Sequence, residues 1–151
     1  MDQLDISIIQ ALQEDARKSY TDIAKLLNVA EGTVRNRVSR LLADDTLRLR
    51  ATFDYLKVGF DASAVMTISV QPGTLAEVAK ALKVINEVSY LMAITGDADL
   101  LVELTCRDNK HLLDVISNKI GKIPGITDTS TSMVLQVYKE LLPSLSSLNS
   151  D

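Results

Sequence analysis

Residues 19–42 read SYTDIAKLLNVAEGTVRNRVSRLL and contain two short amphipathic helical patterns on either side of a tight break at residues 28–30. This layout is typical of a helix-turn-helix, whose second helix can enter the major groove of DNA. Basic side chains cluster in or just after that second helix. Five of the chain's seven arginines lie there: Arg35, Arg37, Arg40, Arg48 and Arg50. The stretch therefore predicts a DNA-binding fold for the N-terminal part of the chain.

The spacing of apolar residues predicts three helices: one that begins at residue 2 or 5 and ends at residue 14, one capped by Ser19, and one over residues 31–43. The third has an apolar stripe that we expect to be buried, formed by Val34, Val38, Leu41 and Leu42. The polar residues that point away from this stripe are Asn36, Ser39 and Arg40, and Thr33 flanks them one turn earlier. Arg35 and Arg37 lie at the edges of the stripe. The alternation at residues 47–50 predicts a short strand that leads out of this unit.

The charge distribution limits how the chain can contact nucleic acid. The net charge is −4, yet residues 1–50 carry eight basic and eight acidic side chains, so the excess of acid lies in residues 51–151. A strongly basic chain is the usual footprint of a nucleic-acid binder. Any DNA contact must here come from a small patch, which oligomerisation would multiply.

Composition indicates a globular, cytoplasmic protein with an aliphatic core. Hydrophobic residues make up 46% of the chain, and no apolar run approaches the roughly 18 residues that span a membrane. The N-terminus is acidic and lacks the basic segment of a signal peptide. The one cysteine, Cys106, has no intrachain partner for a disulfide. We expect a cytoplasmic location and no membrane partner.

The second half of the chain changes to strand periodicity. Residues 62–70 alternate, a turn at residues 71–73 follows, and residues 74–77 match a capping box that opens a helix. Two strands around the turn at residues 96–99 predict a hairpin. Asp108 or Asn109 then caps a second helix, and residues 127–138 form the last strand. The inward residues expected on the two helices are Leu75, Val78, Ala79, Leu82 and Ile85, and Leu112, Leu113, Ile116 and Ile120.

The order βαββαβ predicts a ferredoxin-like domain. The whole chain is then an α+β protein: a helix-turn-helix domain over residues 1–50, a linker over 51–61, a ferredoxin-like αβ sandwich over 62–142 and a Ser-rich, frayed tail over 143–151. Helices cover one face of such a sheet. The other face carries several apolar residues in either register, and a second copy of the same sheet is the simplest partner for it.

Taken together, these motifs resemble the Lrp/AsnC (feast/famine) family of transcription regulators. The matching positions run through nearly the whole chain, and their order and spacing together are specific. In the N-terminal half they are Leu4-Asp5, Leu12, Ala16-Arg17, Ile23-Ala24, Val29, Thr33-Val34 and residues 37–41; in the C-terminal half they are residues 95–101, 123–126 and 129–131.

The resemblance implies a sequence-specific DNA-binding regulator that dimerises and commonly assembles further, to octamers. It also implies a small effector, usually an amino acid, bound between dimers. The groove-facing residues it implies are Thr33, Asn36, Arg37 and Arg40. The effector residues it implies are Thr95, Gly96, Asp97, Asp99, Thr131 and Met133.

Three positions depart from the family pattern. Ala30 occupies the N-cap of the recognition helix where Ser is usual, and the loss of that cap costs about 1 kcal/mol. Asp45 stands where Gly usually ends the helix, and Asp tolerates the left-handed conformation less well than Gly. Ala98 replaces an aromatic residue that is common in the acidic turn, which leaves open whether the effector is an amino acid.

Each candidate residue also has an ordinary structural interpretation. Asn36 and Arg40 can be a solvated helix face, but after a helix-turn break they suit base contacts, and the remaining arginines (Arg35, Arg37, Arg48 and Arg50) suit phosphate contacts. Asp97 and Asp99 can be simple turn residues. We expect His111 to be a lone surface residue and Cys106 to be a small buried one.

Two other functions stay open at this stage. One is a small-molecule-binding or assembly protein of this type that has lost DNA binding. The other is an enzyme that resembles siroheme decarboxylases, but residues 88–91 read Val-Ser-Tyr-Leu where those enzymes use histidines. Because metal-ligand clusters, nucleophile elbows and glycine-rich phosphate loops are not found in the sequence, we expect no enzyme activity, no cofactor and no metal.

Overall fold

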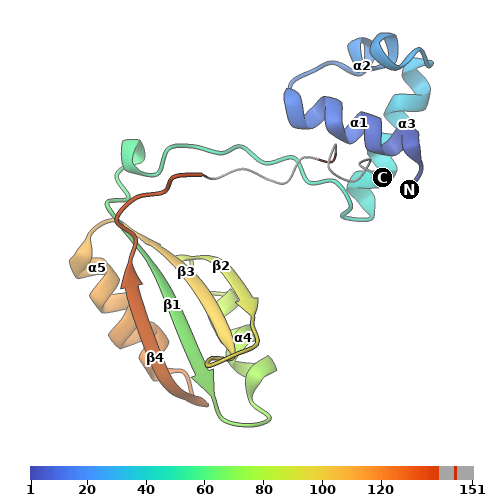
Figure 1. Cartoon of the computed structure of the whole chain (residues 1–151). Coiled ribbons are helices and arrows are strands. Elements are labelled where there is room, and N and C mark those ends of the chain that lie inside the picture. Colours follow the sequence, from blue (N-terminus) through green and yellow to red (C-terminus); the bar gives the residue numbers. More distant parts are fainter. Residues whose placement is uncertain (140–144, 146–151) are drawn as a thin grey trace. The chain divides into compact units, whose positions relative to one another are not determined.

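The computed structural model describes residues 1–139 and 145. The chain forms two compact units (Figure 1). The first contains Met1–Thr52 together with Lys139 and Leu145, and the second contains Phe53–Tyr138. Among the helices of the described residues, none is long and apolar enough to cross a membrane. The expected frayed tail over 143–151 lies outside the described residues, apart from Leu145, which packs against the core of the first unit.

The first unit is built from α1 (Gln3–Glu14), α2 (Tyr20–Leu27) and α3 (Glu31–Ala43). Polar caps set where two of these helices begin. Asp2 and Asp5 form a reciprocal capping box at the start of α1, and Ser19 caps α2 by accepting a hydrogen bond from the Asp22 N–H. Ala30 gives α3 no side-chain cap, as its sequence predicts.

Left-handed residues end α2 and close the segment after α3. Asn28 has φ 53° and ends α2, so the chain reverses within three residues before α3 begins. Asp45 has φ 60° at the position where the sequence predicts a strained substitute for glycine. Both are residue types that tolerate this conformation best among the non-glycine residues.

The three helices enclose one aliphatic core, and Figure 1 shows α2 and α3 joined by the short turn. The fully buried side chains include Ile8, Ile23, Val34 and Val38. The prediction that Leu42 is buried is wrong, since 38% of it is exposed. Leu41 lies on the line of the stripe, whereas Leu42 is one residue, or about 100°, further round the helix.

The short strand predicted at residues 47–50 is absent. Leu47 instead folds back onto the first unit, where it is buried and its N–H donates to the Leu41 carbonyl at 2.9 Å. Arg48 and Arg50 are exposed on both sides of half-exposed Leu49. An isolated alternating segment has no ladder partner here, so its hydrogen bonds are not those of a strand.

The second unit has the predicted ferredoxin-like order. It contains β1 (Ala62–Val70), α4 (Leu75–Lys83), β2 (Val88–Ala93), β3 (Leu100–Cys106), α5 (Asn109–Asp114) and β4 (Ile126–Met133). The strands form one antiparallel sheet in the order β2-β3-β1-β4, with α4 and α5 on the same face (Figure 1). The predicted hairpin is β2 and β3.

Period-two alternation builds the core of this unit, as predicted. Ala62, Ala64, Met66 and Ile68 of β1 are all buried against the helices. Cross-strand partners on β3 extend the same face: Leu100, Val102, Leu104 and Cys106. The central position of β1 and β3 in the sheet explains why these two strands carry the most regular burial.

Both helices of this unit differ in detail from the prediction. Thr74 precedes α4 without capping it, because its hydroxyl donates to the Gln71 carbonyl at 2.9 Å; Leu75 is then 39% exposed. After α5 the chain widens into a π turn over Val115–Lys119. A π turn changes which residues share a face, so Val115 is buried and Leu113 is 64% exposed.

The last strand ends at Met133, five residues before the predicted end, because β1 offers it no further partner beyond Ser63. On the sheet face away from the helices, apolar side chains alternate with polar ones. Val65 lies opposite Glu103, Thr67 opposite Leu101, and Met92 also opposite Leu101. This face is therefore more polar than the bare apolar surface that was predicted from the sequence.

Candidate nucleic-acid interface

Helix α3 presents the predicted polar face to solvent. Arg35, Asn36, Ser39 and Arg40 are exposed, and Thr33 and Arg37 are partly exposed. The opposite side of the helix carries Val34, Val38 and Leu41, which are buried. The helical period alone was sufficient to sort these residues between core and surface.

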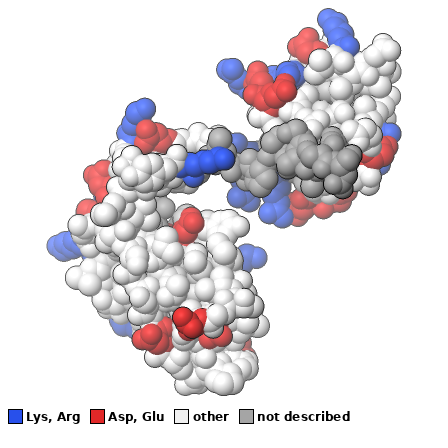
Figure 2. Space-filling view, viewed as in Figure 1, with Lys and Arg blue, Asp and Glu red and all other residues white. Residues whose placement is uncertain are grey.

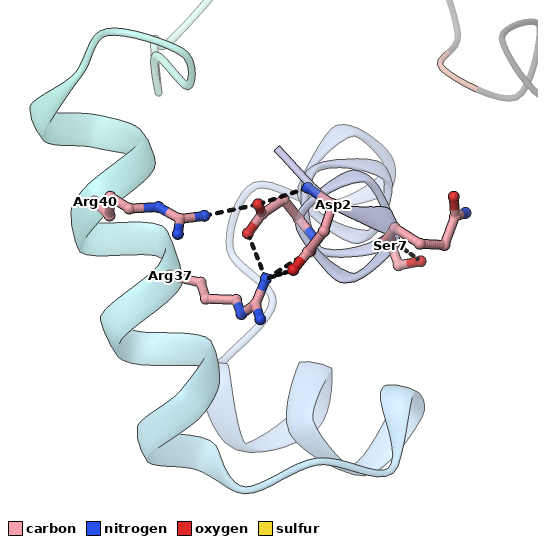
Figure 3. Close-up of polar contacts among 6 residues, drawn as sticks. Asp2, Ser7, Arg37 and Arg40 are labelled. Carbon is pink, nitrogen blue, oxygen red and sulfur yellow. Dashed lines mark hydrogen bonds and ion pairs between the residues drawn. The ribbon is translucent and has the colours of Figure 1, made fainter.

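Two carboxylates at the start of α1 hold the two central arginines of α3 (Figure 3). Arg37 Nη1 donates to both carboxylate oxygens of Asp2, at 2.6 and 2.5 Å, and to Asp5 Oδ1 at 3.0 Å. Arg40 Nη2 donates to Asp5 Oδ2 at 2.7 Å. Residues 32–43 contain no acid, and folding supplies two carboxylates from a segment more than thirty residues away.

These contacts favour the charged forms of Asp2, Asp5 and Arg37. The hydrogen bond from Arg37 and those from the helix backbone lower the pKa of Asp2 to about 2. Burial opposes ionisation of Asp5, but hydrogen bonds from the Asp2 N–H and Arg37, with the charge of Arg40, outweigh it and lower the pKa of Asp5. The same bonds, from Asp2 first, raise the pKa of Arg37. Asp5 is 1% exposed and is the one buried charged residue of the described chain.

The contact role of Asp5 was not predicted, although the sequence contains a signal for it. Ile9 and Leu12 follow Asp5 at i+4 and i+7, so the carboxylate belongs to the side of α1 that faces the core. A buried carboxylate requires a partner of opposite charge. The family motif had included Asp5 without assigning it a contact.

The other predicted arginines have different surroundings. Arg35 pairs with Glu31 at 2.5 Å and lies 5.6 Å from the centre of the Tyr20 ring, so it braces α3 against α2. Arg48 pairs with Asp45 at 3.3 Å. Figure 2 shows Lys and Arg next to Asp and Glu on the helical unit.

The predicted effector turn has a structural use for one of its two acids. The Asp99 carboxylate accepts a hydrogen bond from the Val70 N–H at 2.8 Å, and the Asp99 N–H donates to the Ile68 carbonyl at 3.0 Å. Asp97 is exposed, as is Thr95, and Gly96 has φ 123°, a conformation that requires glycine. The turn therefore ties the hairpin to β1 and leaves the Asp97 carboxylate outside.

The two predicted effector residues of β4 do not join this turn within one chain. Thr131 pairs with Met66, and Met133 pairs with Ala64. The turn lies at the other end of β1, where Val70 pairs with Ile126. Seven residues separate Ile126 from Met133, which is about 23 Å along a strand.

The prediction that His111 is a lone surface residue is wrong. Its side chain is 19% exposed, its Nδ1 accepts from the Arg107 N–H, and its Nε2 lies 3.0 Å from Glu87. Lys119 Nζ also donates to both Glu87 oxygens and, against the effect of burial, lowers the pKa of Glu87. The cluster joins the start of β2 to α5 and the π turn.

Cys106 is fully buried, as predicted, and burial raises the pKa of its thiol. Among the residues that the structure describes, no group of three or more His, Cys, Asp or Glu side chains could hold a metal ion.

Comparison with known proteins assigns both units. Residues 1–42 match the AsnC-type helix-turn-helix domain, and residues 63–143 match the Lrp/AsnC ligand binding domain. The chain is 39% identical over 140 residues to an HTH-type transcriptional regulator of Pyrococcus furiosus, covering 92% of this chain and 95% of that protein. It is 34% identical over 144 residues to the transcriptional regulator LrpA of Pyrococcus horikoshii, covering 92% and 99%.

Solved structures share the whole architecture. AsnC of E. coli matches with a TM-score of 0.85 and 26% identity, over 95% of this chain and 98% of that one. A regulator of Neisseria meningitidis, solved in complex with L-Met, matches with a TM-score of 0.82 and 22% identity, over 97% and 98%. A helix-turn-helix unit joined to a ligand-binding α+β unit defines a class of transcriptional regulators. Within that class, this chain belongs to the Lrp/AsnC family, which confirms the resemblance seen in the sequence.

Proposed function

We propose that the exposed face of α3 reads a specific DNA sequence in the major groove. The observation that carries this proposal is the placement of Asn36, Ser39 and Arg40 on the solvent side of the second helix of the motif. Arg40 can pair with guanine and Asn36 with adenine, each pair discriminating by about 1–3 kcal/mol. Thr33 flanks these residues on the same helix. Contacts to DNA phosphates, which position the protein without reading sequence, are assigned in this proposal to Arg35, Arg37, Arg48 and Arg50.

We further propose that the protein works as a homodimer that assembles further, as far as an octamer. Pairing of the uncovered sheet faces would bury Val65, Met92 and Leu101 and place two copies of α3 on one pseudo-palindromic site. Residues 1–50 are then the DNA-binding domain, 51–61 the linker, and 62–142 the effector-binding and assembly domain. In this proposal the protein acts on DNA in the cytoplasm. Its role is regulatory and controlled by an effector, and it is not an enzyme.

The effector in this proposal is a small molecule, most simply an amino acid. Two comparisons support it: residues 63–143 match the Lrp/AsnC ligand binding domain, and the Neisseria meningitidis protein of the same fold was solved with L-Met. In this chain the exposed Asp97 carboxylate suits an ammonium group. Met133 and Thr131 lie far from Asp97 along β4, so a site that uses all of Thr95, Gly96, Asp97, Asp99, Thr131 and Met133 would need more than one copy of the chain.

A fluorescence-anisotropy titration tests this function. It compares DNA from upstream of the protein's own gene with unrelated DNA of equal length at physiological salt, with and without a mixture of amino acids. Tight binding to the first DNA alone supports sequence reading, and a shift in affinity with the mixture supports an amino-acid effector. Equal, weak binding to both DNAs, unaffected by the mixture, contradicts the proposal for that site.

Two observations favour a second candidate, a ligand-binding assembly protein of this family that does not bind DNA. Helix α3 begins without a side-chain cap at Ala30, and both Arg37 and Arg40 are engaged by carboxylates of the same unit. If no duplex binds more tightly than the others in a selection from random-sequence DNA, while amino acids alter the oligomeric state, this second function replaces the first.

A further inference from the structure

The two carboxylates at the start of α1 that contact α3, those of Asp2 and Asp5, differ sharply in their surroundings. Asp5 is 1% exposed and accepts hydrogen bonds from Arg37, Arg40 and the Asp2 N–H. Asp2 has 56% of its side chain exposed, at the free end of α1. Removing Asp5 from its partners would leave a buried charge, whereas Asp2 can separate from Arg37 into water.

The contact between Asp2 and Arg37 has the form of a phosphate contact. Both oxygens of the Asp2 carboxylate accept from Arg37 Nη1, at 2.6 and 2.5 Å, and 26% of the Arg37 side chain remains exposed. A DNA phosphate likewise presents two anionic oxygens to an arginine. Asp2 and a phosphate would compete for the same donor.

We propose that Asp2 occupies, in the free protein, the place on Arg37 that a DNA phosphate takes in the complex, while Asp5 keeps hold of Arg40 in both states. This inference rests on the proposed function. DNA must displace Asp2 whatever its base sequence, so the exchange lowers affinity for every duplex by one common factor. Binding to unrelated DNA is thereby suppressed, and Asp5 keeps Arg40 in place for base reading.

The variant Asp2→Asn tests the exchange without unfolding the helix. Asn is as good an N-cap as Asp, so α1 keeps its start. The probe is a mixed-sequence 20-base-pair duplex at low salt, measured by anisotropy with the full-length protein. We expect Asp2→Asn to tighten binding about two- to five-fold, the range of an exposed ion pair. The same factor should appear on any duplex that the protein prefers.

Two further variants make the result specific. Glu14→Gln removes the same charge from the other end of α1, where Glu14 pairs with Lys18, and should leave affinity unchanged. In an Arg37→Gln background, Asp2→Asn should have no further effect, because the shared donor has gone.

The outcomes separate the inference from the function beneath it. If the unsubstituted protein binds DNA and Asp2→Asn leaves affinity unchanged or weakens it, the exchange is refuted and DNA binding stands. If the gain persists in the Arg37→Gln background, or if Glu14→Gln matches it, the effect is one of overall charge and the exchange is again refuted. Failure of the unsubstituted protein to bind any duplex removes both the exchange and the proposed function.

Discussion

Arg40 is the residue on which base reading by α3 depends most. Its side chain is 56% exposed, and its contact with Asp5 is made by Nη2. We expect Arg40→Ala to reduce affinity for a preferred duplex about five-fold or more, with a much smaller loss on unrelated DNA. Anisotropy titrations on both duplexes measure this ratio.

The matched control is Arg17→Ala, which removes the same charge from the same unit at a side chain that is 93% exposed after α1. It should change both affinities alike and only slightly. Equal losses on the two duplexes for Arg40→Ala would mean that Arg40 contacts phosphate and reads no base.

Asp2 predicts a specific pH dependence of stability. Its pKa is about 2 in the folded protein, against a usual value of 3.8, so the unfolded chain binds more protons between these values. The contribution of Asp2 to stability is therefore complete above pH 4 and is lost as the pH falls towards 2. Acid unfolding of α1, followed by hydrogen exchange of its amides, should be less steep in Asp2→Asn; an unchanged profile would assign the loss to other carboxylates.

At the scale of elements, helix α3 differs from α1 and α2 in that it begins without a side-chain cap. Ala30 supplies no oxygen to the free N–H groups of the first turn, and the Thr33 N–H already turns back to the Ala30 carbonyl. We expect Ala30→Ser to stabilise α3 by about 1 kcal/mol. Native-state hydrogen exchange of α3 amides measures the gain.

The reverse substitution at the start of α2 provides the comparison. Ser19 accepts from the Asp22 N–H at 3.1 Å, and Ser19→Ala should destabilise α2 by a similar amount. If Ala30→Ser leaves α3 protection unchanged while Ser19→Ala lowers that of α2, the first turn of α3 is satisfied in another way.

The elements themselves follow closely from local sequence, and the exceptions have tertiary causes. The helices, β1 and β3 were predictable because their apolar residues keep one period over several turns or pairs. The prediction of a strand at residues 47–50 was wrong because Leu47 packs into the core of the helical unit. The prediction that Leu113 is buried was wrong because a π turn, which periodicity does not reveal, follows α5.

At the scale of the whole molecule, the site was less predictable than the fold. The helical period placed Asn36, Ser39 and Arg40 on the surface. The period of α1 likewise indicated that Asp5 needs a partner of opposite charge, but no local pattern identified Arg37 and Arg40 as the partners. Long-range ion pairs leave little trace in one sequence. The same holds for Glu87 with His111, which are 24 residues apart.

The proposed dimer, paired through the sheet face away from the helices, gives a prediction at this scale. Leu101 lies on that face of the central strand β3, opposite Thr67 and Met92. We expect Leu101→Glu to dissociate the dimer, since it would bury an unpaired charge at the interface. Sedimentation velocity measures the mass. The control Leu113→Glu, at a 64% exposed leucine of α5, should leave the dimer intact; equal behaviour of the two variants would place the interface elsewhere.

The central claim, that α3 reads DNA in the major groove, is tested most directly by guanine N7 methylation protection on the duplex that binds most tightly. N7 lies in the major groove beside the atoms that arginine contacts. We predict protected guanines in two clusters about one helical turn, or a multiple of it, apart, and loss of that protection with Arg40→Ala at concentrations where the variant still binds. Tight binding with no protected guanine, or protection unaffected by Arg40→Ala, would contradict the claim.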